Sequence, residues 1–431
     1  MGGETMTIVR TGTSVAAIAA WLGIAGAAAA QTTIDMLHVE NNPDAVALWE
    51  ELAAEYEAAN PGIDVNLEFL ENEAFKAKLP SLLQSDEAPD IFYSWGGGVL
   101  DIQRESGALR PLTEMMDAEG GAWRNTYSEG AINGLSFDGD VWAVPYRTGV
   151  VAFFYNKEQF EQAGVEAAAI QTWDDLLAAV QTLKDAGLTP ITCGGADKWP
   201  LHFYYSYLIM RNGGSAALEA AKSGAPDAYL DPAIVQAGEQ VAELGALEPC
   251  QNGWQGSRWP EPLGDFADGR AAMILGFEDT NLDQISQATD GQGLAQENIG
   301  RFAFPVVEGG AGAATDTFGG LNGWAVTANA PDEAIDFLRW FTAPEQQRRQ
   351  AETTGMIPVV AGAEEGVVDP LVRASAEALA TSGYHQNYLD QDLGPNLGRT
   401  VNDVTVELWD GSTSPEDAAQ TLQDTAMMEE M

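Results

Sequence analysis

Polar and aromatic side chains follow several apolar, strand-like runs of this sequence, and together they could bind a hydroxylated ring. Carboxylates, amides and basic groups satisfy hydroxyls, while aromatic faces cover the C–H faces of a pyranose. In open α/β sheets such residues meet at the carboxyl ends of strands, and a cleft between two lobes brings two such edges face to face. The candidates are His38, Glu40, Asn41, Glu71, Ser94, Trp95, Arg147, Asp197, Lys198, Trp199, Trp254, Phe277, Glu278 and Asn322.

The tryptophans among and near these candidates have an alternative role in the core. A tryptophan taken alone more often packs in a hydrophobic core than against a ligand. For Trp95 and Trp199 we favour the cleft, because each stands among polar or turn-forming residues. Trp254 and Trp259 lie in a loop broken by Gly and Pro, which favours neither role, and Trp324 lies within an apolar strand, which favours packing.

The elements that must position these side chains alternate between short apolar runs and helical segments. This rhythm is typical of βαβ units and predicts a mainly parallel sheet covered by helices. The apolar run 150–155 predicts a buried strand that leads into helices, and Thr172 is expected to be the N-cap of the second. Strands are expected at 34–39, 63–69 and 91–95, and helices at 45–60 and 74–84.

The length of the chain predicts more than one compact unit. Its 431 residues exceed what one hydrophobic core usually holds, so we expect two lobes of the α/β class. Hydrophobic residues make up 45% of the chain, which is typical of a globular protein and excludes general disorder.

The charge balance is strongly acidic, with 20 Lys and Arg against 65 Asp and Glu and a formal net charge of −45. Nucleic acid and anionic membrane surfaces are excluded as partners, because both require a basic surface. The acidic residues are dispersed, which favours a solvated surface adapted to a saline habitat. Calcium binding is the alternative, but the sequence contains no D-x-[DN]-x-[DN]-G loop closed by a glutamate, and no metal site is expected.

Two cysteines, Cys193 and Cys250, are present. In an exported chain we expect them to form a disulfide, with two free buried thiols as the alternative. A zinc site is not expected, because two cysteines and three scattered histidines do not provide a ligand set.

The N-terminus predicts export. Arg10 precedes an apolar run at 15–27, and three alanines stand before Gln31. This pattern is typical of a cleaved secretory signal peptide spanning residues 1–30. A permanent membrane anchor is the alternative, but the run is short. The run is not followed by a cysteine to which a lipid could be attached. We therefore expect a periplasmic protein.

Six segments carry a resemblance to a known family, and they occur in that family's order. The segment at 141–187 contains VPYRTGVVAFFYNKEQFEQAG and TWDDLLAAVQTLKDAG, and it resembles the signature of family 1 extracellular solute-binding proteins. These are the sugar-capturing components of bacterial ABC importers. Similar segments are DIFYSWGGGVLDIQRESGALRPL at 90–112, PITCGGADKWPLHFYYSYLIMRNGG at 190–214, DFADGRAAMILG at 265–276, 319–346 and 388–418.

The resemblance implies a two-lobe periplasmic binding protein fold with discontinuous lobes joined by a hinge. It implies an N-terminal lobe at 31–147 and 302–343, and a C-terminal lobe at 148–301 and 344–431. The hinge is then expected near Arg147, Asn298 and Pro344. The family members are monomers, so a monomer is expected here.

The resemblance also implies a function. The protein would capture a carbohydrate, a small oligosaccharide or a modified monosaccharide, by hinge closure. It would deliver this ligand to membrane permease subunits without any cofactor. The sequence has no G-x-x-x-x-G-K-[ST] loop, so the ATPase is expected on a separate chain.

The resemblance bears on the roles of Glu278, Phe277 and Asp390, and Arg147 stands at the expected hinge. The family often carries a tryptophan that stacks on the sugar two positions after the glycine of "AM…G", and here Glu278 stands there. Either carboxylates replace the stacking ring or Phe277 stacks instead. Asp390 is expected to contact the ligand from the C-terminal lobe. Arg147 could fork onto a ligand, but an ion pair with an acidic neighbour at the hinge is favoured.

Two other functions are considered. A secreted glycoside hydrolase would need two carboxylates across a cleft, which this acidic chain could supply. No G-x-S-x-G or H-E-x-x-H motif is present, so catalytic residues are not expected. A binding protein for a cationic compatible solute suits the acidic, tryptophan-rich composition through aromatic cages. Steep weakening of ligand binding with salt would support that alternative.

Overall fold

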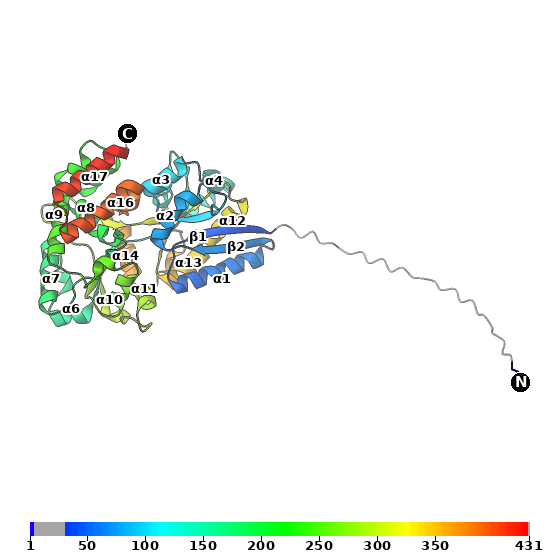
Figure 1. Ribbon diagram of the computed structural model, residues 1–431, viewed down its shortest axis with the longest axis horizontal. Helices are drawn as coiled ribbons and strands as arrows, with labels where there is room; N and C mark the ends of the chain where they lie inside the picture. The colour runs from blue at the N-terminus through cyan, green and yellow to red at the C-terminus, as the bar shows by residue number, and fades with distance from the viewer. Residues whose placement is uncertain (4–30, 430–431) are drawn as a thin grey trace.

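The structure, a computed structural model, describes residues 1–3 and 31–429 and consists of two α/β lobes (Figure 1). The expected signal peptide at 1–30 lies almost entirely outside the described residues. Among the helices that are described, none is both long and apolar enough to cross a membrane.

The N-terminal lobe is built on a six-stranded sheet with the strand order β12-β6-β11-β3-β1-β2. Strand β1 pairs in parallel with β2 and β3, and β11 runs antiparallel between β3 and β6. The ends of β1, β2, β3 and β6 and the start of β11 therefore lie along one edge. The strands are β1 (Thr32–His38), β2 (Ile63–Phe69), β3 (Ile91–Ser94), β6 (Ala143–Thr148), β11 (Leu321–Val326) and β12 (Ile357–Pro358).

Helices cover this sheet, and local sequence explains where they begin. The first helix starts at Pro43, whose missing N–H costs nothing at that position, and the Asn42 side chain accepts hydrogen bonds from Asp44 N and Ala45 N. Its Trp49 is buried against Trp324 of β11, as expected for a core tryptophan. The helices are α1 (Pro43–Ala59), α2 (Asn72–Leu82), α3 (Gly97–Glu105), α4 (Thr113–Gly121), α5 (Glu129–Asn133), α12 (Asp332–Phe341) and α13 (Pro344–Thr354), with a small hairpin of β4 (Ser136–Phe137) and β5 (Asp140–Val141). A further helix, α14 (Pro370–Ala380), lies at the boundary with the other lobe.

The C-terminal lobe contains a smaller sheet in which β7 runs antiparallel to both β8 and β9. Thr172 caps α7 in a reciprocal capping box with Asp175, which confirms the expected N-cap. Figure 1 shows α6, α7 and α9 on the side of this lobe that faces away from the other lobe. The elements are β7 (Ala152–Asn156), β8 (Met273–Gly276), β9 (Ile299–Phe302), β10 (Thr317–Gly319), β13 (His385–Asn387), α6 (Lys157–Ala163), α7 (Trp173–Asp185), α8 (Trp199–Lys222), α9 (Pro232–Ala246), α10 (Glu261–Ala267), α11 (Thr280–Gln287), α15 (Leu389–Asp392), α16 (Pro395–Asp410) and α17 (Pro415–Glu429).

The chain passes between the lobes at places that partly differ from those expected. The first crossing follows Thr148, one residue from the expected boundary. The second boundary at 302 is corrected, because Phe304 and Phe318 pack in the C-terminal core. The third boundary at 344 is corrected too, because the following residues to 367 pack in the N-terminal core, with Met356 fully buried there. The N-terminal lobe therefore comprises 31–148 and 320–369.

The remaining residues complete the C-terminal lobe and one bridging helix. Helix α14 contributes Val372 to the N-terminal core, while its neighbour Leu371 packs against the C-terminal lobe. The C-terminal lobe comprises 149–319 and 381–429. Within it a disulfide joins Cys193 to Cys250 with a Cα–Cα distance of 5.6 Å, as expected from the sequence.

Candidate functional site

A cavity of about 160 Å³ lies between the edges of the two lobes. The N-terminal lobe supplies the residues that follow β1, β2 and β3, together with the ends of β6 and β11 that face them. The C-terminal lobe supplies the loop between β8 and α11, helix residues from the start of α8 and from α11, and single residues from three other loops. The lining residues are Val39, Glu40, Asn41, Asn42, Phe69, Glu71, Asn72, Tyr93, Trp95, Arg147, Gly149, Trp199, Trp259, Phe277, Glu278, Asp279, Asp283, Asn322, Thr354 and Tyr388.

Arg147 joins the two lobes at this cavity. Its Nη2 donates to Glu278 Oε1 and to Asp279 Oδ2, both at 2.7 Å. Burial raises the pKa of Glu278 to about 7, although the guanidinium of Arg147 opposes the shift. The two carboxylates in turn raise the pKa of Arg147 well above its ordinary value despite its burial. The ion pair expected from the sequence therefore lies across the lobe boundary.

Gly149 makes the close approach of Glu278 possible. A Cβ at position 149 would overlap the Glu278 carboxylate. The next residues form the first crossing, where Gly149 N donates to Gly320 O at 2.9 Å and Val151 N donates to Phe318 O at 2.8 Å. Two crossing segments are thus hydrogen bonded to each other beside the cavity.

Glu40 and Asp283 add two further carboxylates to the cavity. Glu40 Oε1 accepts from Asn41 N at 3.0 Å and from Asn42 N at 2.9 Å, which turns this side chain back over the start of α1. Asn42 Nδ2 also donates across the boundary to Asp283 Oδ1 at 2.7 Å. Burial raises the pKa of Glu40 and raises that of Asp283 to about 7.

Aromatic rings from both lobes also line this cavity. The C-terminal lobe supplies a cluster in which Trp199 lies 5.3 Å from Trp259 and 5.9 Å from Phe277, with the second pair stacked at 30° between planes. The N-terminal lobe supplies Trp95, which packs edge-on to Tyr93 at 5.5 Å. Flat apolar faces from both lobes therefore border a space that is also lined by charged groups.

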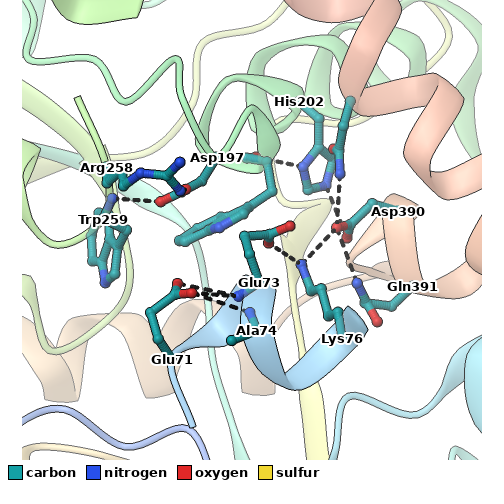
Figure 2. A network of polar contacts seen from close by, with 12 residues as sticks. Glu71, Glu73, Ala74, Lys76, Asp197, His202, Arg258, Trp259, Asp390 and Gln391 are labelled. Carbon is teal, nitrogen blue, oxygen red and sulfur yellow. Dashed lines mark hydrogen bonds and ion pairs between the residues drawn. The ribbon is translucent and has the colours of Figure 1, made fainter. Parts of the chain in front are cut away.

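A second, smaller cavity of about 50 Å³ adjoins the first and shares five lining residues with it, Trp95 and Trp199 among them. Figure 2 shows Lys76 of α2 and His202 of α8 directed at Asp390 of α15. Lys76 Nζ lies 3.8 Å from Asp390 Oδ2, and His202 Nε2 lies 3.6 Å from Asp390 Oδ1. Burial alone would raise the pKa of Asp390, but His202 and Lys76 shift it downward overall. Burial lowers the pKa of His202.

A larger groove of about 1030 Å³ also lies between the lobes, near α3, α5 and α17. Its lining includes one phenyl ring, that of Phe137, and otherwise consists largely of small and polar residues. It lacks the facing aromatic walls that suit a flat ring, so the smaller cavity is the better candidate for a ligand site.

The matching family model decides the class of this protein. A model described as bacterial extracellular solute-binding protein matches residues 40–348. The chain belongs to this family. Members bind solutes rather than transform them, so the expectation that the protein is not an enzyme is confirmed.

Relatives and solved structures agree with this assignment. The multiple sugar-binding protein of Streptococcus mutans is 24% identical over 356 residues, which cover 79% of this chain and 78% of the relative. A structure from work on xylan utilization by the thermophilic bacterium Caldanaerobius polysaccharolyticus has a TM-score of 0.84 at 24% identity and covers 91% of this chain and 99% of the other. A chitin oligosaccharide binding protein has a TM-score of 0.82 at 24% identity, covering 92% and 98%. The expected two-lobe fold is confirmed.

Most of the residues expected at the ligand site of this solute-binding protein lie together. Asp390 lines the smaller, adjoining cavity. The residues that line the main cavity are Glu40, Asn41, Glu71, Trp95, Arg147, Trp199, Phe277, Glu278 and Asn322. Glu71 also serves as the N-cap of α2, because its carboxylate accepts from Glu73 N and Ala74 N (Figure 2).

Two expected residues of the N-terminal lobe lie outside both cavities. His38 is buried at the end of β1, where its ring packs edge-on to Trp49 at 5.2 Å, and burial lowers its pKa to about 4. Ser94 is buried at the end of β3, and its Oγ accepts from Gly96 N at 3.2 Å. Both side chains support the loops that carry the cavity residues.

Three expected residues of the C-terminal lobe also lie elsewhere. Asp197 is buried and accepts from Arg258 Nη1 at 2.8 Å and from Trp259 N at 2.7 Å, so it holds the loop that carries Trp259 (Figure 2). Lys198 is half-exposed and pairs with an aspartate of α16. Trp254 packs against the C-terminal core.

The lining residues that were not among the expected ones include Tyr93, Trp259, Asp283 and Tyr388. Trp259 had no preferred role in the sequence, and its place depends on the long-range bond to Asp197. Tyr388 stands two positions from Asp390 in the segment that resembles the family, which was a usable signal. In the parts of the chain that the structure describes, no group of three or more His, Cys, Asp or Glu could hold a metal ion.

Proposed function

We propose that this protein is the exported ligand-capturing component of an ABC importer and that it binds a carbohydrate in the cavity between its lobes. The observation that carries the proposal is the cavity lining. Aromatic rings from both lobes line the cavity together with carboxylates, amides and one guanidinium, which are the groups a pyranose requires. The sugar-binding relative and the chitin oligosaccharide binding protein support the same class of ligand.

The size of the cavity favours a single ring. A volume of about 160 Å³ is small for a ligand site, since such sites usually measure about 300–1,000 Å³. Of the two expected ligand classes, a modified monosaccharide therefore fits better than an oligosaccharide in this closed arrangement of the lobes.

Capture would occur by closure of the two lobes around the ligand. A ring in the cavity touches residues of both lobes, so it stabilises the closed form over the open one. The hydrogen-bonded crossings beside Gly149 would serve as the hinge. The closed form would then dock as a monomer on permease subunits, with export to the periplasm directed by the N-terminal signal.

The test is calorimetric titration of the protein beginning at Gln31 with a panel of monosaccharides, polyols and oligosaccharides. We expect micromolar binding of a monosaccharide, and mass spectrometry of the recovered ligand should find it unaltered. Trp199→Leu should weaken binding at least tenfold, which is about 1.4 kcal/mol. Trp340→Leu is the control, because Trp340 packs on Tyr56 in the N-terminal lobe, away from the cavity.

Two results would contradict the proposal. Equal loss of affinity in the Trp199 and Trp340 variants, at equal melting temperature, would place the ligand elsewhere. Conversion of a sugar to product would replace transport with catalysis.

A further inference from the structure

The main cavity carries far more negative than positive charge. Its lining includes five carboxylates, from Glu40, Glu71, Glu278, Asp279 and Asp283, and one guanidinium, from Arg147. Arg147 is shared between two of the carboxylates, while Glu40, Glu71 and Asp283 are held by backbone N–H groups or by an amide. Hydrogen bonds from neutral groups orient these carboxylates without cancelling their charge.

Asn322 adds an unused acceptor on the same side. Its side chain is only 7% exposed and lines the cavity, and its Oδ1 has no hydrogen-bond partner. Asn322 stands directly opposite Arg147 on the antiparallel pair of β11 and β6. Directly opposed residues project to the same face of a sheet, so this amide lies beside the guanidinium and its carboxylates. A ligand that donates an N–H or O–H group would satisfy it.

From these two observations we propose that the ring bound in this cavity carries a protonated amine, so that the ligand is an amino sugar with a free amino group. This inference depends on the proposed function and makes its substrate class specific. The ammonium would lie among Glu40, Asp283 and the Asn322 amide, and the apolar face of the ring would lie on Trp199 and Phe277.

The raised pKa values around the cavity agree with such a ligand. Burial raises the pKa of Glu40, Glu278 and Asp283, so the empty cavity tends to take up protons from solvent. A ligand that brings its own positive charge replaces those protons and meets ionised carboxylates. A neutral sugar brings no such charge, so these carboxyl groups would still take up protons from solvent.

Other cations fit the cavity less well. A quaternary ammonium has no N–H to donate to Asn322 and would leave its oxygen without a partner. A metal ion requires a compact ligand set, which the described residues do not form. An ammonium on a hydroxylated ring uses the acceptors and the aromatic wall together.

The experiment compares matched ligands on the protein beginning at Gln31. D-Glucosamine, D-glucose and N-acetyl-D-glucosamine are titrated at pH 7.5, with the corresponding galactose series and tetramethylammonium alongside. We expect the free amine to bind at least tenfold more tightly than the neutral and acetylated sugars of the same configuration. Added salt should weaken only the amine.

Variants test the assigned groups. Asp283→Asn and Asn322→Leu should each reduce the advantage of the amine over the neutral sugar at least threefold, and neither touches the Arg147 ion pairs. Glu55→Gln is the control, because Glu55 pairs with Arg349 outside the cavity. It should leave the advantage unchanged.

The outcomes separate this inference from the proposed function. If neutral and amino sugars bind equally, the inference is wrong and the sugar-binding proposal stands. If no sugar of either series binds and tetramethylammonium does, both are wrong. A preference for the amine that persists in both variants would also overturn the assignment of the amine to this side of the cavity.

Discussion

Replacement of Arg147 by methionine removes the only cation that contacts Glu278 in the described part of the chain. The two ion pairs of Arg147 are well shielded, with the Glu278 side chain 2% exposed and that of Asp279 14% exposed. Methionine keeps the apolar stem of the side chain and loses the guanidinium. Glu278 then remains buried without a compensating charge.

The expected cost follows from the burial of these groups. Removing one partner of a buried ion pair costs about 3–5 kcal/mol in free energy of unfolding. Arg349→Met is a matched control, because Arg349 also binds two carboxylates, those of Glu51 and Glu55, at 2.8 Å each. These carboxylates are 62% and 43% exposed, so that loss should cost about 1 kcal/mol or less.

The assay is urea unfolding of the ligand-free protein, followed by tryptophan fluorescence at pH 8 and pH 5.5. With a pKa of about 7 in the intact protein, Glu278 is ionised at pH 8 and largely protonated at pH 5.5. The cost of Arg147→Met should therefore be larger at pH 8. Addition of Glu278→Gln to the Arg147 variant should recover at least half of the loss at pH 8.

Two results would refute this reasoning. Equal destabilisation by the Arg147 and Arg349 substitutions would mean that the pairs across the lobes are as weak as surface pairs. A cost that does not change with pH, and is not recovered by Glu278→Gln, would mean that loss of packing rather than uncompensated charge is responsible.

Three further predictions concern the lobes and their charge. Replacing Cys193 and Cys250 by serine should lower the free energy of unfolding by about 4 kcal/mol relative to the disulfide-bonded wild type, because the disulfide closes a loop with a sequence separation of 57. Urea unfolding of the two proteins measures this difference, and the reduced wild type should resemble the variant. Gly149→Ala should weaken ligand binding in calorimetry, since its Cβ would overlap the Glu278 carboxylate, whereas Gly256→Ala has open space and should not. The ligand-free protein should lose stability as the pH rises from about 4.5 through about 7, because the raised pKa of Glu278 makes the folded state hold a proton that the unfolded chain has released. In thermal unfolding, Glu278→Gln should reduce this dependence of stability on pH.

Local sequence was sufficient to predict the strands and the cavity residues at the edge of the N-terminal sheet. Strand β2 has the expected bounds and β1 and β3 lie within two residues of them. The side chains just after these strands include Glu40 and Trp95, which do line the cavity. Alternation along a strand and the common direction of parallel strands determine such positions, and both can be inferred from a short window of residues.

Long-range partners decided the positions that were wrong. Asp197 has the residue type and the position of a ligand contact, but Arg258 and Trp259 bind it from about sixty positions away in the chain. The lobe boundary at 302 failed for a similar reason, since Phe304 stacks on Tyr207 at 4.3 Å between centroids and so stays with the C-terminal core. Neither contact leaves a local pattern in the sequence.

Position 278 holds a glutamate where the family often carries a stacking tryptophan, and both explanations offered for this difference hold in the structure. The family resemblance implies a stacking tryptophan there, and the sequence left open whether carboxylates or Phe277 take its place. Phe277 stacks on Trp199, so the aromatic wall is kept one residue earlier. The carboxylate of Glu278 is turned to Arg147 and Gly149 at the first crossing instead. In the family resemblance position 278 contacts the ligand, whereas here Glu278 also joins the two lobes through Arg147. Because the protonation of this one carboxyl affects both contacts, the affinity for a charged ligand and the closure of the lobes should change together with pH.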